Sequence, residues 1–238
     1  MKYLIFLLYT FLLFLPQVLL RTSNQSQYSK YLNRFQHWPI KSLSTPANDW
    51  GNSATIYLDR HNINCGIGAI NEFHYQRVGN LKFKYDYKCI MPKNCENNRY
   101  CVQKTIDYDK KKCLKKTTKL NVIPSQAGRH VNYLDRHYVN CDAPAKGSNK
   151  GYVLTQFHLA RKPPLIQYDY TCCPAKVSNY KTIYTTWTKF DNYGSIYLDR
   201  QVVKVPDPKN QAIVGFKLDV NYGKKTFRYT VNVVNVTG

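Results

Sequence analysis

A five-residue phrase occurs three times in this chain. Tyr-Leu-Asp-Arg-His stands at residues 57–61 and 133–137, and Tyr-Leu-Asp-Arg-Gln stands at residues 197–201. Each copy is followed by an apolar-x-x-Phe segment and then by an alternating run of aromatic and polar residues. Self-similarity of this kind indicates an internal repeat, whose units need one another to bury their apolar faces. The sequence therefore predicts three similar units.

Period-two alternation of β-branched and aromatic residues predicts that these units are all-β. We expect the closing runs to be strands, and we expect each opening phrase to be a strand as well. Three such units fit a β-prism closed around a pseudo-threefold axis, with a β-trefoil as the alternative. The expected segments are an N-terminal extension at 21–44 and a single domain at 45–238, with repeats at 45–90, 122–173 and 182–238 and an insert at 91–121.

The cysteines add a constraint on how each unit is closed. The first two units have two cysteines apiece, and the third unit has valine at both corresponding positions, read as Val205 and Val231. Joint loss predicts that the two cysteines of a unit pair with each other, because losing one partner would leave a free thiol. The predicted disulfides are Cys65–Cys89 and Cys141–Cys172. The remaining four allow three pairings: Cys95, Cys101, Cys113 and Cys173.

The first twenty residues indicate the compartment. Lys2 precedes an apolar run at residues 4–15, which Pro16 interrupts before the sequence turns polar at Arg21. This layout is typical of a signal peptide at 1–20, with an uncleaved membrane anchor as the alternative. We expect a secreted protein with no stable membrane span after cleavage, glycosylated at the sequons of Asn24 and Asn235.

The repeated frame resembles one known family. A cysteine, an apolar-x-x-Phe-x-apolar strand and an alternating strand ending in cysteine run from Cys65 to Cys89 and again from Cys141 to Cys172, and residues 213–218 follow the same pattern. This order is similar to the vitelline membrane outer layer protein I family of secreted β-prism proteins. The family's paired tryptophans and its Asp-Asp-Thr-Ala stretch are absent here. The resemblance implies a prism fold and an extracellular, egg-coat-like role, and it names no ligand.

The repeated Asp-Arg pair has two readings. A threefold fold could bring three carboxylates to one site. We expect instead that these residues join neighbouring repeats, because a motif present in every repeat usually contributes to the contacts between repeats. They are Asp59, Arg60, Asp135, Arg136, Asp199 and Arg200. The next residues, His61, His137 and Gln201, have no metal-ligand spacing, so we predict neither a metal nor a cofactor. No nucleophile motif is present, and we predict no catalytic residue.

A dense cationic stretch lies in the insert. Its lysines could bind an anionic partner such as sulfated or uronate-rich glycan, acidic mucin or lipid headgroups, or they could form a solvated loop. They are Lys104, Lys110, Lys111, Lys112, Lys115, Lys116 and Lys119. The chain has a formal net charge of +21, which would also suit nucleic acid, but a secreted chain rarely meets it.

Three functions of different classes follow from these features. The first is a non-enzymatic, lectin-like domain that recognises anionic extracellular polymers. The second is a structural component of a coat, matrix or filament that assembles by β-type self-association, and the third is a secreted hydrolase.

Tyrosine is abundant, at 21 residues, and those outside the repeated frame are the candidates for an exposed surface: Tyr100, Tyr108, Tyr138 and Tyr193.

Overall fold

The computed structural model describes residues 38–49, 51, 54–66, 68–91, 113–122, 130–145, 147–191 and 194–237. We divide them into a first unit (38–91), a second unit (113–177) and a third unit (178–237). Several predicted features lie outside the described residues: the expected signal peptide, most of the expected N-terminal extension, Asn24, Cys95, Cys101, Lys104, Lys110, Lys111 and Lys112. So do Tyr100, Tyr108 and Tyr193.

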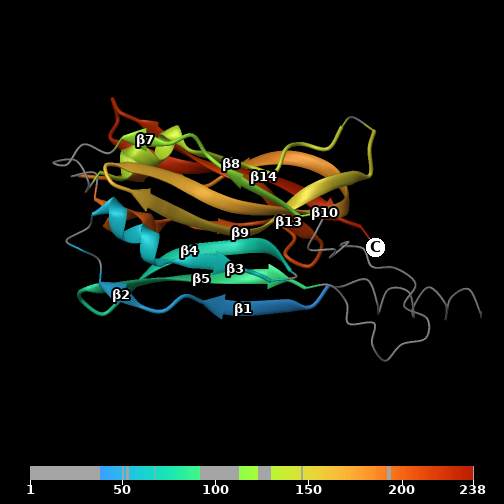
Figure 1. Ribbon diagram of the computed structural model, residues 1–238, viewed down its shortest axis with the longest axis horizontal. Coiled ribbons are helices and arrows are strands. Elements are labelled where there is room, and N and C mark those ends of the chain that lie inside the picture. Colours follow the sequence, from blue (N-terminus) through green and yellow to red (C-terminus); the bar gives the residue numbers. More distant parts are fainter. Residues whose placement is uncertain are drawn as a thin grey trace, which may run out of the picture. The chain divides into compact units, whose positions relative to one another are not determined.

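The described chain is mostly β and forms two antiparallel sheets (Figure 1). The first sheet has the order β1-β5-β4-β12, with β2 also paired to β5. Its strands are β1 (Ile40–Ser44), β2 (Asn48–Asp49), β4 (Ala69–Val78), β5 (Lys82–Ile90) and β12 (Val202–Lys204). The all-β prediction is confirmed.

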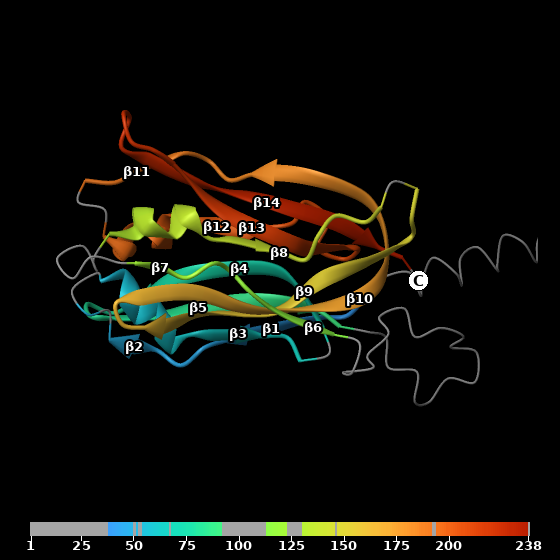
Figure 2. The ribbon, with the colours of Figure 1, turned by 45° about the horizontal axis from the view of Figure 1, so that its top comes forward.

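The second sheet has the order β3-β9-β10-β14-β13-β8, with β6 and β7 paired to β10 and β11 paired to β14. Its longest strand, β10 (Leu165–Tyr184), pairs with β9 over Leu165 to Lys176 and with β14 from Val177 onward. In Figure 2 this strand curves around one end of the molecule. The others are β3 (Asn62–Asn64), β6 (Leu114–Thr117), β7 (Asn121–Val122), β8 (Tyr138–Asn140), β9 (Lys150–Lys162), β11 (Thr188–Lys189), β13 (Gln211–Asn221) and β14 (Thr226–Val236).

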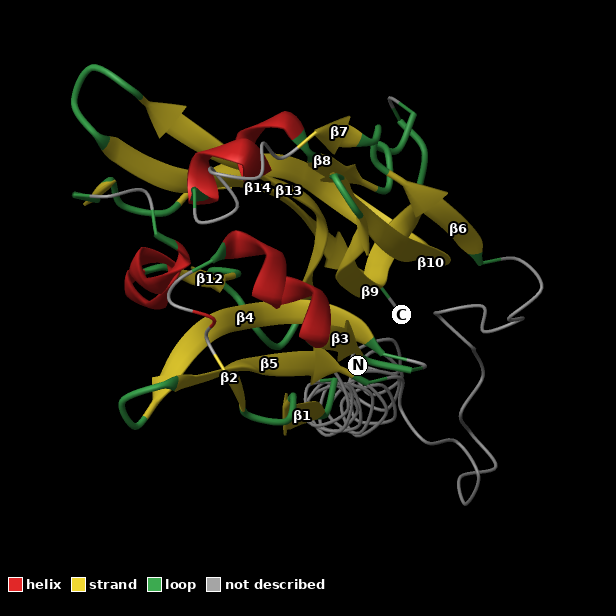
Figure 3. Cartoon of the chain, turned by 60° about the vertical axis from the view of Figure 1, so that its left-hand side comes forward, coloured by secondary structure: helices red, strands yellow, loops and turns green. Residues whose placement is uncertain are grey.

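The opening phrases form 3₁₀ helices, so the prediction that they are strands is wrong. The helices are η2 (Thr55–Arg60), η4 (Val131–Arg136) and η5 (Ser195–Arg200), and they gather at one end of the molecule (Figure 3). Each buries residues three apart, which matches the three-residue turn of a 3₁₀ helix and not the alternation of a strand. The same spacing stacks each Arg on the Tyr before it, at 4.1, 4.6 and 4.8 Å from the ring centroid. All three copies form the same element, so their equivalence stands.

Each helix is followed by a short strand that pairs with a strand of another unit. Strand β3 of the first unit pairs with β9 of the second, β8 of the second with β13 of the third, and β12 of the third with β4 of the first. Every unit therefore gives one strand and receives one. The hydrogen bonding defines two sheets and no closed prism or trefoil among the described residues, so closure around an axis remains a prediction.

The core contains a ring of six aromatic side chains, one Phe and one Tyr from each unit. Phe73, Phe157 and Phe216 contact one another with ring centroids 4.8 to 5.1 Å apart. Tyr85, Tyr168 and Tyr229 each lie between two of these phenylalanines, at 5.7 to 6.4 Å. Most of these contacts are edge-to-face, the arrangement that aromatic rings favour. The apolar-x-x-Phe segments thus build the shared core.

Three disulfides are described, and two are those that the sequence predicts. Cys65 pairs with Cys89 and Cys141 with Cys172, with Cα atoms 5.6 and 5.4 Å apart. The third pairs Cys113 with Cys173, so the adjacent Cys172 and Cys173 bridge to different partners. Such bridges indicate folding in an oxidising compartment.

The prediction that Val231 takes the position of the second cysteine in the third unit is wrong. Ile70 lies opposite Cys89 and Leu154 opposite Cys172, whereas Ile213 lies opposite Val233. The valine that replaces the second cysteine is therefore Val233, and Val231 replaces a tyrosine instead. Phe227 and Tyr229 are both aromatic and two residues apart, so the alternating pattern allows either register.

The units also begin earlier than expected. Strand β1 starts five residues before position 45, and β6 and the first residue of β7 lie within the expected insert at 91–121. Strand β6 pairs with β10 as β1 pairs with β5. Lys115 and Lys116 therefore lie on a framework strand of the second unit, and Lys119 in the turn that follows it.

Candidate functional site

The histidines after the first two phrases belong to a buried polar contact that recurs in every unit. A threonine hydroxyl (Thr45 or Thr118) contacts the His Nδ1 atom at 2.9 or 2.8 Å. The same oxygen accepts a hydrogen bond from the backbone N–H of Tyr85 or Tyr168. In isolation this would resemble a nucleophile beside a base.

The third unit shows that this contact is structural. Thr185 accepts from the backbone N–H of Tyr229 at 2.8 Å and donates its hydroxyl to the amide oxygen of Gln201. An amide oxygen can only accept, so Thr donates here, and the histidine Nδ1 atoms take the place of this amide oxygen in the first two units. Burial, aided by the adjacent Arg60 or Arg136, lowers the pKa of His61 and of His137 to about 4. Both imidazoles are therefore neutral at physiological pH.

The aspartates of the opening phrases contact neighbouring units. Asp199 forms an ion pair with Arg77 at 2.8 Å, and Asp135 accepts a hydrogen bond from the Tyr222 hydroxyl at 2.7 Å. Burial raises the pKa of Asp59, an effect opposed chiefly by Arg161 of β9. Each of these carboxylates thus faces the unit that receives the short strand of its own unit. The three do not gather at one site.

The described lysines of the expected anionic site are not brought together into a pocket. Lys116 pairs with Asp142 at 2.7 Å, while Lys115 and Lys119 are exposed. The structure gives them no shared geometry that would orient a ligand.

The outer face of the third unit differs from those of the first two. Three of its aromatic side chains are exposed, with relative accessibilities of 37% for Tyr180, 56% for Tyr184 and 45% for Trp187. A fourth, Tyr138 at 42%, comes from β8 of the second unit, which pairs with β13 of the third. We call these four residues, together with Arg228, the aromatic face. Only Tyr138 could be chosen from sequence, because Tyr184 and Trp187 stand in a segment that looks like an ordinary strand.

Contacts hold the aromatic face in place. The Arg228 guanidinium lies 4.1 Å from the centroid of Tyr184 and 4.6 Å from that of Trp187, and it faces Asp219 at 3.6 Å. The Tyr138 hydroxyl accepts a hydrogen bond from the amide of Asn232. Burial and a hydrogen bond between the Tyr180 and Tyr138 hydroxyls raise the pKa of Tyr180 to about 12. Flat rings held by such contacts lose little freedom when a ligand stacks on them.

The positions equivalent to Tyr138, Tyr184 and Trp187 in the repeat are not aromatic. Strand pairing aligns Tyr184 with Ser44 and Thr117, and Tyr138 with Val202 and Asn62. Counting two residues beyond the buried threonine aligns Trp187 with Ala47 and Leu120. These three rings of the aromatic face are therefore not required by the repeat.

A pocket of about 360 Å³ opens beside Tyr184, between the end of β10 and β12. Its lining has two cationic side chains, Arg200 and Lys204, and no Asp, Glu, His, Ser or Cys. The other lining residues are Ile183, Tyr184, Thr185, Thr186, Gln201, Val202 and Val231. A pocket of this size falls in the range that holds small ligands.

Within the described part of the chain, no group of three or more His, Cys, Asp or Glu side chains is placed to hold a metal ion. Likewise, none of the described helices has the length and apolar character needed to span a membrane. Searches of protein-family models, of curated proteins and of solved structures find no match to this chain.

Proposed function

We propose that this protein is a secreted, lectin-like domain that binds an anionic glycan through the aromatic face of its third unit. The observation that carries the proposal is the asymmetry of the repeat. Two positions that are Ser, Thr, Ala or Leu in the first two units are Tyr184 and Trp187 in the third, and these rings are exposed. Exposed aromatic rings suit stacking on the apolar faces of sugar rings, and contiguous patches of this kind mark interaction sites.

The positive charge of the chain favours a negatively charged ligand. Arg228 lies within the aromatic face, and Arg200 and Lys204 line the adjoining pocket. With a net charge of +21, the protein attracts anionic polymers over a range set by salt. Sulfated or uronate-containing glycans of an extracellular matrix combine both chemistries. The lysine-rich segment at 91–121 would then add long-range attraction rather than a shaped site.

We also infer that the three units close around a pseudo-threefold axis as a β-prism. The exchange of short strands from first to second, second to third and third to first unit supports this closure. The ring of six aromatic side chains, to which every unit contributes equally, supports it as well. The closure agrees with the frame shared with vitelline membrane outer layer protein I, and with an extracellular coat as the setting.

The test removes the two most exposed rings. In Tyr184→Ala/Trp187→Ala, affinity for an anionic glycan should fall by about tenfold or more, because Tyr and Trp anchors commonly dominate binding energies. The matched control is Thr117→Ala/Leu120→Ala, which changes the equivalent positions of the second unit. Binding of both variants to a glycan array is measured at low and at high salt. If the first variant binds like the parent protein, the aromatic face is not the site.

Self-association is the alternative that the same face allows. An exposed aromatic patch could contact a second copy, as a structural coat component would require. Size-exclusion chromatography of the parent protein over a range of concentrations separates the two functions. Concentration-dependent assembly that survives high salt and is lost in Tyr184→Ala/Trp187→Ala would favour the structural role.

A further inference from the structure

We infer that the pocket beside Tyr184 is a subsite for the charged substituent, a sulfate or a carboxylate, of one sugar residue. This inference rests on the proposed glycan binding and names the feature of the ligand that the site selects. It follows from comparing the same place in the three units.

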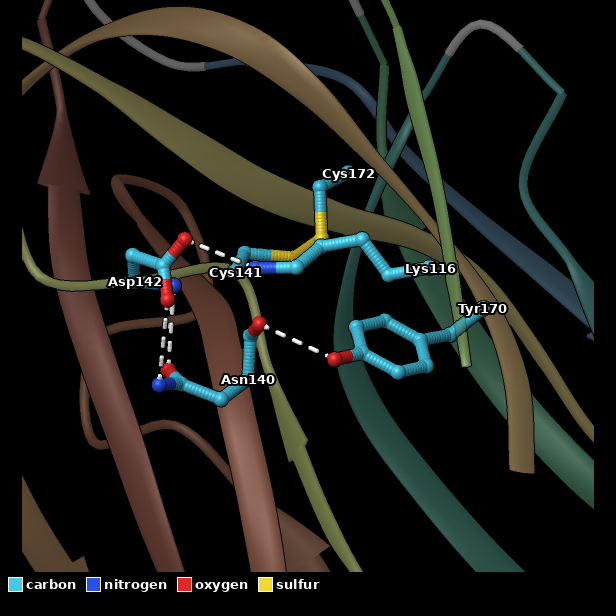
Figure 4. A network of polar contacts seen from close by, with 6 residues as sticks. All are labelled: Lys116, Asn140, Cys141, Asp142, Tyr170 and Cys172. Atoms are coloured by element: carbon cyan, nitrogen blue, oxygen red, sulfur yellow. Dashed lines mark hydrogen bonds and ion pairs between the residues drawn. A yellow bond between two sulfur atoms is a disulfide. The ribbon is translucent and has the colours of Figure 1, made fainter. Parts of the chain in front are cut away.

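In the first two units a tyrosine spans this place. The Tyr87 hydroxyl donates to the Asn64 carbonyl oxygen, and the Tyr170 hydroxyl donates to the Asn140 carbonyl oxygen, both at 3.2 Å. Figure 4 shows the second of these contacts, with the Tyr170 hydroxyl directed at Asn140. Both tyrosines are almost fully buried. Their rings therefore fill the space between their own strand, β5 or β10, and the short strand of the same unit, β3 or β8. We call this space the seam.

The third unit has Val231 where the others have tyrosine. Phe216 lies opposite Val231, as Phe73 lies opposite Tyr87 and Phe157 opposite Tyr170. Lys204 holds the place of Asn64 and Asn140, being the last residue of its short strand. Without a ring the seam stays open, and Val231, Val202 and Lys204 line the resulting pocket.

The open seam carries positive charge and no compensating acid among its lining residues. Within the described part of the chain, Lys204 Nζ has no hydrogen-bond or ion-pair partner. Arg200 donates to the Lys189 carbonyl at 3.4 Å and stacks on Tyr197, which fixes its direction while leaving other N–H groups for a ligand. A guanidinium beside an ammonium suits an oxyanion with several acceptor oxygens.

Tyr184 connects the pocket to the aromatic face, because it belongs to both. A sugar stacked on Tyr184 would place a neighbouring substituent within reach of the pocket. The face would then supply affinity for the ring, and the pocket would supply preference for the anion.

The central variant is Val231→Tyr, which restores the residue that fills the seam in the other two units. Lys204→Ser is the second variant, since an exposed lysine can be replaced with little effect on folding. Lys209→Ser is its matched control, an exposed lysine in the loop after β12 that does not line the pocket. Three hexasaccharide probes are compared by calorimetry: hyaluronan with carboxylates only, keratan sulfate with sulfates only, and neutral chitohexaose.

The parent protein should prefer at least one anionic probe to chitohexaose by about tenfold, the scale of one charge-assisted contact. Val231→Tyr should remove that preference while leaving chitohexaose binding unchanged, and Lys204→Ser should weaken it where Lys209→Ser does not. Which anionic probe responds separates a carboxylate from a sulfate. If Val231→Tyr does not fold, an unchanged preference in Lys204→Ser overturns the inference.

The outcomes also separate this inference from the proposed function. If Val231→Tyr and Lys204→Ser keep the preference while Tyr184→Ala/Trp187→Ala loses all binding, the pocket is not a subsite and the function stands. If only the pocket variants respond, the aromatic face is not the platform. Failure of the parent protein to bind any of the three probes would overturn both.

Discussion

A disulfide can be built into the third unit, which lacks the bridge equivalent to Cys65–Cys89 and Cys141–Cys172, and its position tests the corrected alignment. Val205 and Val233 are fully buried and take the places of Cys65 and Cys89. The backbone N–H of Val205 donates to the Asn71 carbonyl as that of Cys65 donates to the Thr155 carbonyl, at 3.0 and 2.9 Å. The variant Val205→Cys/Val233→Cys should therefore form a bridge without moving the backbone.

The magnitude follows from the length of the closed loop. Positions 205 and 233 are 28 residues apart, between the separations of 24 and 31 in the two native bridges. Loop-closure entropy for this length gives about 3.5 kcal/mol. Replacing two buried valines costs roughly 1 kcal/mol in lost packing. The net gain of about 2.5 kcal/mol should raise Tm by about 5–10 °C for a domain of this size.

The measurements are thermal unfolding with and without reductant, and peptide mapping of the unreduced protein. The matched control is Val205→Cys/Val231→Cys, which follows the alignment read from sequence alone. Position 231 is displaced by two strand residues, about 6.6 Å, so its thiol should stay free. A bridge in the control, or free thiols in Val205→Cys/Val233→Cys, would refute the structural register.

Two further predictions concern contacts between and within units. The folded-state pKa of about 4 for His61 and His137 lies below the ordinary 6.5, so their stabilising effect is complete above pH 6.5 and is lost as pH falls toward 4. Replacing both by Gln, the residue that Thr185 contacts in the third unit, should flatten the pH dependence of Tm in that range. It should change stability at pH 7.5 by no more than about 1 kcal/mol, and an unchanged pH profile would contradict this account. Asp199→Asn should cost about 0.5–1 kcal/mol in chemical denaturation, because its ion pair with Arg77 is half-exposed. A loss several times larger would mean that the pair does more than join two units.

Much of the frame could be predicted because it depends on local pattern. Alternating burial makes the closing strands readable, and the paired absence of cysteines makes two disulfides readable. The 3₁₀ helices were missed because their β-branched and aromatic composition resembles that of a strand, while burial every third residue is a signal of only two positions. The buried threonines were missed because Thr45 and Tyr85 lie 40 residues apart, so nothing local links them.

The candidate site could not be predicted for a different reason. Charge density drew attention to the lysine-rich segment, but a run of charges has no geometry until a structure supplies it. Tyr184 and Trp187 lie in a segment of strand-like composition. The alternation of polar and apolar residues there does not indicate which face of the strand is exposed to solvent. Buried and exposed aromatic side chains can be told apart only once the strand register shows which positions in the three units are equivalent.

The third unit has lost stabilising contacts that the other two keep. It lacks a disulfide, worth about 3.5 kcal/mol for loops of this length, and it lacks the tyrosine hydroxyl that closes the seam, worth about 1 kcal/mol. Loss of the disulfide is balanced in part by two well-packed valines, because Val205 and Val233 are fully buried. Loss of the tyrosine is not balanced in this way, since Val231 leaves an open pocket rather than a filled one. The two losses therefore differ in kind. The first is a repacking of the core. The second removes a contact and exposes cations beside the aromatic face, which is the combination expected where a ligand binds.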